Sequence, residues 1–486
     1  MRPRSDQARS DQQTSGRRFD RRAGSRLLAV VTIAAVVVLA LVPLRSADAA
    51  PPVPTPAADS ALTWLAGELA ANGGTIPGFL PGVSDWGVTA DAILAFVAAG
   101  RATDAAAVTA TDALAANQAL FTTWAPDMPA VRVTGATGKT LLVLLAMGRP
   151  ATVGGVDLEA ELRSLMVTSG DQAGRFVDRV PDPAWDSSNG FAQSLSILAL
   201  ALTSSGVPEP AVSYLLAQQC PSGGFRLNQT GTAGCTDDAT ADTDATGLAL
   251  QALLALTPRS PAVASALDRG FGWLLSRQDA STGAFGGTGP TAAANTNSSG
   301  VIAQALRAAG LTEPADRAAA WITNQNQLTA ANAGDTPASI DVGAIAHDPA
   351  ALTDAITTGI ADLAADQWRR STTQGVLALG LSPYGPQSPA PLQQPPATTT
   401  TTTTTSVSTT TQAPAPPTTT ATTANAAVDV SSSSAAVNSP TVSPASAPSV
   451  QGRLALTGTS ASLLIGIGIL AIGLGLLVTG AARARR

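Results

Sequence analysis

The chain has 486 residues, a formal net charge of -6 and only 4% aromatic residues. It has no basic cluster away from its termini, which argues against nucleic acid as a partner. Only the part before about Gly385 has the composition to build a hydrophobic core, and hardly any of it alternates as a strand would. These features predict an all-α domain.

Residues 1–50 are expected to be an export signal. Residues 17–26 are strongly basic, residues 27–44 are apolar, and Ala47-Asp48-Ala49 supplies the small residues that a signal peptidase reads. Cleavage is therefore expected next to Ala49 or Ala50. An uncleaved transmembrane anchor is the alternative interpretation, and both place the mature chain outside the cytosol.

Between residues 57 and 385 a helix–loop–helix unit recurs about every 50 residues, the kind of period that signals a repeat architecture. The second helix of each unit is apolar nearly all round, as expected of a helix packed on both sides. Six such inner helices are predicted, at residues 86–100, 137–148, 188–202, 244–256, 297–310 and 371–381. Six outer helices precede them, at residues 59–71, 104–120, 158–166, 210–219, 261–278 and 315–327. Residues 338–346 are either an additional short helix or an ordered loop.

The turn between the fourth outer and inner helices carries a recognisable motif. Gln219, Gly223 and Phe225 form a Q-x-x-x-G-x-F pattern that resembles the repeat of the prenyltransferase and squalene-cyclase superfamily, which includes the vitamin B12-carrier α-domains. The resemblance implies an α/α toroid, with about six inner helices, about six outer helices and a central cavity. It predicts a shape more than a reaction. The aromatics that recur in the outer helices, Trp64, Tyr214, Trp273 and Trp321, are predicted to pack between helices.

Two cysteines, Cys220 and Cys235, flank the same turn. In an exported protein this spacing predicts a disulfide, which would contribute about 3 kcal/mol by the chain-entropy model. Zinc is the alternative that the resemblance suggests, because protein prenyltransferases of this superfamily use an Asp, Cys and His set. The only histidine, His347, is distant in the sequence, so no metal and no cofactor are predicted.

Three carboxylates are candidates for catalysis. Asp242-Thr-Asp244 resembles the D-x-D-D acid of class II terpene cyclases, in which a protonated carboxyl group starts polyene cyclisation, although Ala245 departs from that pattern. The resemblance puts Asp244 in the general-acid position, while helix capping is the simpler interpretation. A carboxylate pair across the cavity, as in sugar hydrolases on related toroids, would draw on Asp91, Asp186 and Asp244.

Ligand contacts are expected where inner-ring residues face the cavity or its mouth. Lys139 stands in a Gly-Lys-Thr sequence like the end of a phosphate-binding loop, but Val133 occupies the position where such a loop needs its first glycine. Lys139 is therefore interpreted as an inner-ring residue. Trp185 and Arg370 precede or begin inner helices, where they either contact a ligand or brace the rim. The full set of predicted ligand-binding residues is Trp86, Lys139, Trp185, Gln251, Gln304, Trp368 and Arg370.

Residues 386–450 are rich in Thr, Pro, Ser and Ala and are predicted to be a disordered linker. Leu454-Ala455-Leu456-Thr457-Gly458 follows, then an apolar run at residues 461–480 long enough to form a transmembrane helix, then a basic end at residues 483–486. This order resembles a Gram-positive cell-wall sorting signal (residues 454–486), in the L-A-x-T-G form used by actinobacterial class E sortases. The resemblance implies cleavage after Thr457 and attachment to peptidoglycan. A plain C-terminal membrane anchor is the alternative.

The sequence therefore predicts an exported, wall-anchored surface protein that presents a toroid as a binding or interaction module. Its expected partners are a sortase and peptidoglycan, the membrane through residues 461–480 before sorting, and an unknown small molecule or surface partner. The alternative is an extracellular enzyme of the toroid class, either a glycan hydrolase or lyase or a degenerate terpene cyclase.

Overall fold

The computed structural model describes residues 54–80, 82–229 and 234–384. The predicted export signal (1–50), linker (386–450) and sorting signal (454–486), including the predicted membrane helix 461–480, lie outside the described residues. Within the described ranges, no helix combines the length and the apolar character needed to span a bilayer.

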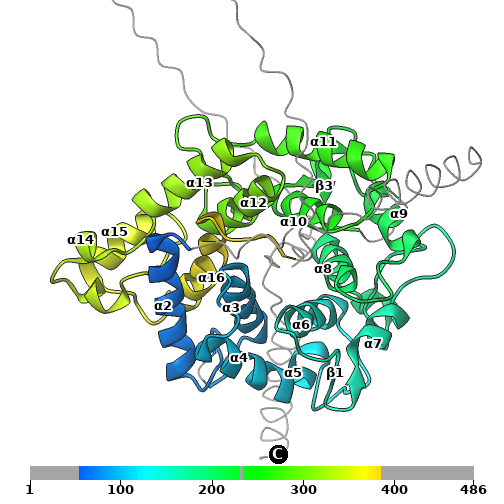
Figure 1. Cartoon of the computed structure of the whole chain (residues 1–486), viewed down its shortest axis with the longest axis horizontal. Coiled ribbons are helices and arrows are strands. Elements are labelled where there is room, and N and C mark those ends of the chain that lie inside the picture. Colours follow the sequence, from blue (N-terminus) through cyan, green and yellow to red (C-terminus); the bar gives the residue numbers. More distant parts are fainter. Residues whose placement is uncertain (1–53, 81, 230–233, 385–486) are drawn as a thin grey trace, which may run out of the picture. The chain divides into compact units, whose positions relative to one another are not determined.

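Six helices form an inner ring (Figure 1). They are α3 (Trp86–Ala98), α6 (Thr134–Ala146), α8 (Gly190–Ala201), α10 (Thr243–Leu254), α12 (Thr296–Ala308) and α16 (Ala365–Gly375). Each packs against the next in this order, and α16 packs against α3, so the ring is closed. Most residues of these helices are buried, because a neighbour covers each side and an outer helix covers the back.

Outer helices surround this ring. They are α2 (Pro56–Ala71), α4 (Ala105–Ala116), α7 (Leu158–Ser164), α9 (Glu209–Ala217), α11 (Pro261–Leu275) and α13 (Thr312–Gln325), with the short α5 (Gln118–Thr122) after α4. Between α13 and α16 lie α14 (Ala330–Ala333), the 3-10 turn η4 (Pro337–Asp341) and α15 (Pro349–Thr358). Two antiparallel pairs, β1 (Thr152–Val153) with β2 (Val156–Asp157) and β3 (Phe225–Arg226) with β4 (Ala241–Asp242), make up the strands of the described part. The predicted all-α ring is confirmed over these residues.

The sixth inner helix differs from its prediction. It begins at Ala365 rather than at Ser371, and the 3-10 turn η5 (Val376–Ala378) continues it. Its first turns are polar, which hid them from a search for apolar periodicity. They are stabilised instead by an ion pair at i,i+4 spacing between Asp366 and Arg370, with the Arg370 Nε 2.8 Å from the Asp366 Oδ2.

The Q-x-x-x-G-x-F turn connects three helices at once. Gln219 Nε2 donates to the carbonyl oxygen of Gly223 and to that of Ala266 in α11, both at 2.8 Å. Phe225 is buried, and its backbone N–H donates to Thr246 Oγ1 in α10 at 2.7 Å. The motif is therefore a structural device that ties an outer helix to the next outer helix and to the inner ring.

The same device closes the ring at the seam, where the last repeat meets the first. Gln327 Nε2 donates to Gly343 O at 3.3 Å and to Ala57 O, in α2, at 2.8 Å. The sequence motif did not show this copy, because α14 and η4 are inserted between the glutamine and its glycine. Residues 338–346, which the sequence left open, are a 3-10 turn followed by the seam turn.

Buried aromatics and one disulfide complete the core. The aromatic side chains expected between helices are buried at Tyr214, Trp273 and Trp321 and partly buried at Trp64. The predicted disulfide between Cys220 and Cys235 is present. Because both sulfurs are oxidised, neither cysteine can serve as a thiolate ligand, which removes the zinc alternative.

Candidate functional site

The polar residues of the inner ring form the candidate site. Lys139, in α6, and Asp91, in α3, make a buried ion pair with 2.6 Å between Nζ and Oδ1. Burial raises the pKa of Asp91, and the Lys139 ammonium group partly offsets that rise. The second carboxylate oxygen, Oδ2, is buried without a hydrogen-bond partner. Asp91 is therefore committed to neutralising Lys139 and holds two neighbouring inner helices together.

The second catalytic candidate, Asp186, organises the connection that leads into α8. Its Oδ2 lies 2.7 Å from Arg175 Nη2, and both side chains are largely buried. Its Oδ1 accepts hydrogen bonds from the backbone N–H groups of Asp178 at 3.1 Å and Ser188 at 3.0 Å. With every oxygen engaged and its charge paired, Asp186 shapes a loop rather than facing a substrate.

Asp244 is the one catalytic candidate without a paired cation. It stands in the first turn of α10, next to Asp242, whose Oδ1 accepts the backbone N–H of Ala245 at 2.7 Å and so caps the helix. Burial and the neighbouring Asp242 carboxylate raise the pKa of Asp244 to about 7, although a hydrogen bond from Ser298 opposes the shift. Its Oδ1 is buried with no hydrogen-bond partner. The predicted capping role belongs to Asp242, and Asp244 is a carboxyl group able to hold a proton near neutral pH.

A glycine packs closely against the Asp244 carboxyl group. A Cβ atom built on Gly287, in the connection between α11 and α12, would lie 3.2 Å from Asp244 Oδ2. Thr288, the next residue, donates to Asp242 Oδ2 and holds this connection against the start of α10. The glycine therefore lets backbone approach the Asp244 carboxyl group closely.

The last segment that the structure describes, residues 380–384, lies at one end of the ring; we call it the strap. Gln304 Nε2 donates to Ser382 O at 2.6 Å, and the Ser382 N–H donates to Ala98 O at 2.9 Å. The Tyr384 N–H donates to Gln251 Oε1 at 3.4 Å. Two predicted ligand-binding residues, Gln251 and Gln304, thus bind the strap (gold in Figure 1).

Tyr384 connects the strap to the ion pair of the inner ring. Burial raises the pKa of the Tyr384 hydroxyl well above its usual range, and the Asp91 carboxylate adds to the effect. The hydroxyl therefore stays protonated. Neither Tyr384 nor Ser298 stood out in the sequence, because Tyr384 follows the last helix and Ser298 looked like one more residue at a helix start.

The remaining predicted ligand residues lie where the inner helices begin. Arg370 pairs with Asp85 and Asp366, and Asp85 also caps α3 by accepting the Val88 N–H at 2.8 Å. Trp86 follows Asp85 and is partly buried against the core. Arg370 therefore joins the last inner helix to the first, and this pairing, like the Gln327 contact at the seam, closes the ring.

The two tryptophans of this set have opposite exposures. Trp185 is 49% exposed, and its ring lies 6.0 Å from that of Trp124, centroid to centroid. Trp368 is only 2% exposed and packs with Leu328 and Leu352 in a second apolar cluster. Trp185 can meet a ligand, whereas Trp368 is a packing residue.

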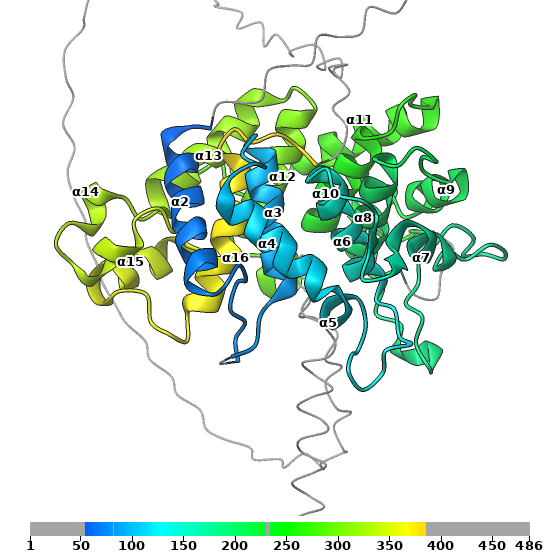
Figure 2. The same ribbon diagram turned by 60° about the horizontal axis from the view of Figure 1, so that its bottom comes forward.

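Exposed large hydrophobic side chains are unevenly distributed. Among the described residues, all but Leu275 lie between an outer helix and the inner helix that follows it, with Leu120 in α5 and Ile340 in η4. They are Phe79, Leu80, Val83, Leu120, Trp185, Ile340 and Leu363. Figure 2 shows the connections before α3, α6 and α8 extending from one end of the ring, while the strap crosses the other end. We call the end where the inner helices begin the open end.

The polar groups do not assemble a metal site within the described ranges. No group of three or more His, Cys, Asp or Glu side chains there is close enough to hold an ion. His347 instead lies with its Nδ1 3.0 Å from Asn297 Oδ1, and burial lowers its pKa. The imidazole is therefore neutral at physiological pH and bound to the start of α12.

Comparison with known proteins adds little beyond the fold. No protein-family model matches the sequence, and no curated protein is significantly similar to it. Solved structures with some likeness include an unsaturated glucuronyl hydrolase from Bacillus sp. GL1, at 13% identity and a TM-score of 0.46, covering 69% of this chain and 99% of that one. Protein geranylgeranyltransferase-I of Candida albicans gives 13% identity and a TM-score of 0.35, over 52% and 69% of the two chains. A type II terpene cyclase from Scytonema gives 20% and 0.30, over 46% and 68%. At these values the likeness supports no assignment of activity.

Proposed function

We propose that this chain is an exported surface protein, anchored to the cell wall through its C-terminal sorting signal, whose ring binds a small molecule at the open end. The disulfide supports export, because such bonds persist outside the reducing cytosol. The contrast between the two ends of the ring supports the choice of site. The strap crosses one end, while the connections at the other carry exposed apolar side chains, and the protonatable Asp244 stands where α10 begins; apolar surface with a few polar groups is the usual composition of a small-molecule site.

The pairing of the candidate carboxylates is the observation that carries this proposal. Glycoside hydrolysis needs two carboxyl groups on opposite sides of the bond to be cleaved, one as acid and one as base or nucleophile. Asp91 is held by Lys139, and Asp186 is held by Arg175. Only Asp244 is left, so a binding role fits the ring better than two-carboxylate catalysis.

A thermal-shift screen tests the binding role. A chain that ends at Gln451, before the sorting signal, is screened against corrinoids, isoprenoids and wall glycans. We expect one class to raise the melting temperature, and we expect Asp244→Asn to weaken that shift. Asp112→Asn, at an exposed side chain in α4, is the matched control and should leave the shift unchanged. If none of the three classes stabilises the protein, the small-molecule role is wrong.

Cell fractionation tests the anchoring. We expect the wild-type chain to leave the cell envelope only after muramidase digestion, attached to peptidoglycan fragments. Thr457→Ala should block the transfer and leave the chain in the membrane fraction. If both forms are extracted by detergent alone, the C-terminal helix is a plain anchor and no covalent attachment occurs.

Acid catalysis by Asp244 is a second candidate function. It is favoured by the pKa of about 7 and by the carboxylate oxygen that lacks a partner, since a general acid works best with a pKa near the working pH. The test is product formation from linear polyprenes, for wild type and Asp244→Asn, with the melting temperature as a control for folding. Turnover by wild type that is lost in the folded variant would support the enzyme and displace the binding role.

A further inference from the structure

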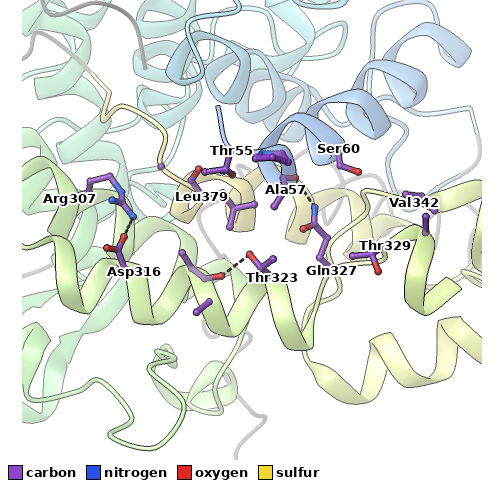
Figure 3. A pocket seen from close by; sticks show the side chains of 15 residues that line it. Thr55, Ala57, Ser60, Arg307, Asp316, Thr323, Gln327, Thr329, Val342 and Leu379 are labelled. Carbon is purple, nitrogen blue, oxygen red and sulfur yellow. Dashed lines mark hydrogen bonds and ion pairs between the residues drawn. The ribbon is translucent and has the colours of Figure 1, made fainter. Parts of the chain in front are cut away.

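An open pocket of about 730 Å³ lies at the seam, between the last outer helix α13 and the first, α2 (Figure 3). Its walls are mostly small and apolar, and include Ala57, Ala319, Ala320, Ala330, Val342 and Leu379. Uncharged polar side chains line it as well, those of Thr55, Ser60, Thr323, Gln327 and Thr329. At one side, Arg307 and Asp316 form an ion pair of 2.7 Å, so their charges balance. We call this space the seam pocket.

At the junction between α9 and α11, the corresponding place holds an arginine. Gln219 Nε2 donates to Ala266 O, and Arg269, the third residue after Ala266, donates from Nη2 to Gln219 Oε1. The guanidinium group therefore satisfies the amide oxygen of the motif glutamine. This contact also ties the glutamine side chain to the next outer helix a second time.

The junction between α11 and α13 repeats this arrangement. Gln278 Nε2 donates to Pro314 O at 2.8 Å, and Arg317, again the third residue on, donates from Nη2 to Gln278 Oε1. Two successive junctions thus use the same guanidinium-to-amide contact. By the contacts of the turn glycines, the corresponding residues at the α2–α4 and α7–α9 junctions are Thr109 and Pro210, so the contact belongs to the α9–α11 and α11–α13 junctions.

At the seam the residue that corresponds to Arg269 and Arg317 is a serine. Gln327 Nε2 donates to Ala57 O, and the third residue after Ala57 is Ser60. The motif glycines confirm that Ser60 corresponds to Arg269 and Arg317. A Cβ atom added to each glycine would collide with the carbonyl oxygen of the corresponding residue in the next outer helix. The distances are 2.5 Å from Gly223 to Arg269, 2.9 Å from Gly283 to Arg317 and 2.2 Å from Gly343 to Ser60.

The short Ser60 side chain leaves both a space and an acceptor. No side chain among the described residues donates to Gln327 Oε1. Figure 3 shows the Gln327 amide nitrogen directed to Ala57 and the oxygen turned the other way, toward the pocket. A serine in place of an arginine removes the long side chain that would otherwise lie there. The seam pocket thus combines an amide oxygen that has no donor among the described residues with mostly apolar walls.

We propose that the seam pocket is a binding site for an alkylguanidinium group, such as an arginine side chain or a small guanidine. The guanidinium group would donate to Gln327 Oε1, as Arg269 and Arg317 do at their own junctions. Its alkyl stem would lie against the apolar wall near Ala57 and Leu379. The site is separate from the open end of the ring and does not depend on what binds there.

Isothermal titration of the full-length chain in detergent with propylguanidinium tests the site, with propylammonium as the comparison cation. We expect one propylguanidinium per chain and weaker or no binding of propylammonium, which lacks the planar donor fork. Ser60→Arg should abolish binding and raise the melting temperature, because its own guanidinium fills the pocket. Ser60→Ala should keep the binding.

A gain-of-site variant provides a test that does not depend on Ser60. Arg317→Ser should empty the equivalent place at the preceding junction and raise the stoichiometry from one to two probe molecules per chain. The proposal is overturned if wild type gives no heat with propylguanidinium. It is also overturned if a folded Ser60→Arg binds the probe as wild type does, or if Arg317→Ser leaves the stoichiometry at one.

Discussion

Replacing Lys139 by methionine tests the buried ion pair of the inner ring. Methionine keeps most of the volume but leaves the Asp91 carboxylate without its cation. The two side chains are 4% and 10% exposed, so solvent cannot compensate the loss. Removing one partner of a buried pair typically costs about 3–5 kcal/mol, and we expect a loss of that size at neutral pH.

The pH dependence of this loss follows from the direction of the pKa shift. Burial already raises the pKa of Asp91 above its ordinary value of 3.8, and removing Lys139 raises it further. The pKa of Asp91 is higher in the folded state than in the unfolded state. Its contribution to stability is therefore fully present at a pH below the unfolded-state pKa and is lost as the pH rises through the folded-state pKa. The variant should therefore approach wild type near about pH 4 and fall away from it toward about pH 7.

Urea denaturation followed by circular dichroism measures both effects. Arg149→Met is the matched control, because its ion pair with Asp112 has a similar 2.7 Å distance but exposed side chains, at 41% and 63%. It should cost less than about 1 kcal/mol at every pH. Adding Asp91→Asn to Lys139→Met should recover part of the loss. The reasoning fails if Lys139→Met is no less stable than the control at neutral pH, or if its deficit does not change with pH.

Three further variants test the turn, the acid and the disulfide. Gly223→Ala should destabilise the fold by more than about 1–3 kcal/mol, which is the cost of a strained φ alone. Gly223 has φ +110, and an added Cβ would also lie 2.5 Å from backbone. The control Gly272→Ala, with open space around it, should be neutral or stabilising when both variants are compared by urea denaturation. Ionisation of Asp244 should make the wild type lose stability as the pH rises from about 4 to about 7, and Asp244→Asn should remove that loss. The variant should therefore show a flatter profile of melting temperature against pH. An unchanged slope would mean that Asp244 ionises normally. Replacing Cys220 and Cys235 by serine should cost about 3 kcal/mol, and a melting temperature insensitive to this change would show that the bond does not stabilise the fold.

The sequence was sufficient for the first five inner helices and for their order, although it did not predict α15 and placed the start of α16 too late. Apolar periodicity located the inner helices that carry Asp91 and Asp244, because a helix packed on both sides needs apolar residues nearly all round. The Gly223 turn and the Cys220–Cys235 bond were equally visible, since both depend on residues close together in the chain. Such features are local, so local patterns predict them.

Only the tertiary structure decided what the candidate site residues contact. Asp91 and Lys139 are 48 positions apart, and nothing in either helix pattern pairs them. Gln251 looked like a ligand contact, but the strap binds it from 133 positions away.

The seam makes the same point, because Ser60 takes the position that Arg269 and Arg317 hold at the two preceding junctions only once the last outer helix meets the first. Ring closure brings these distant groups together. Their burial then determines which carboxyl group is paired with a cation and which keeps its proton. Neither the pairing nor the protonation can be predicted from any single stretch of sequence.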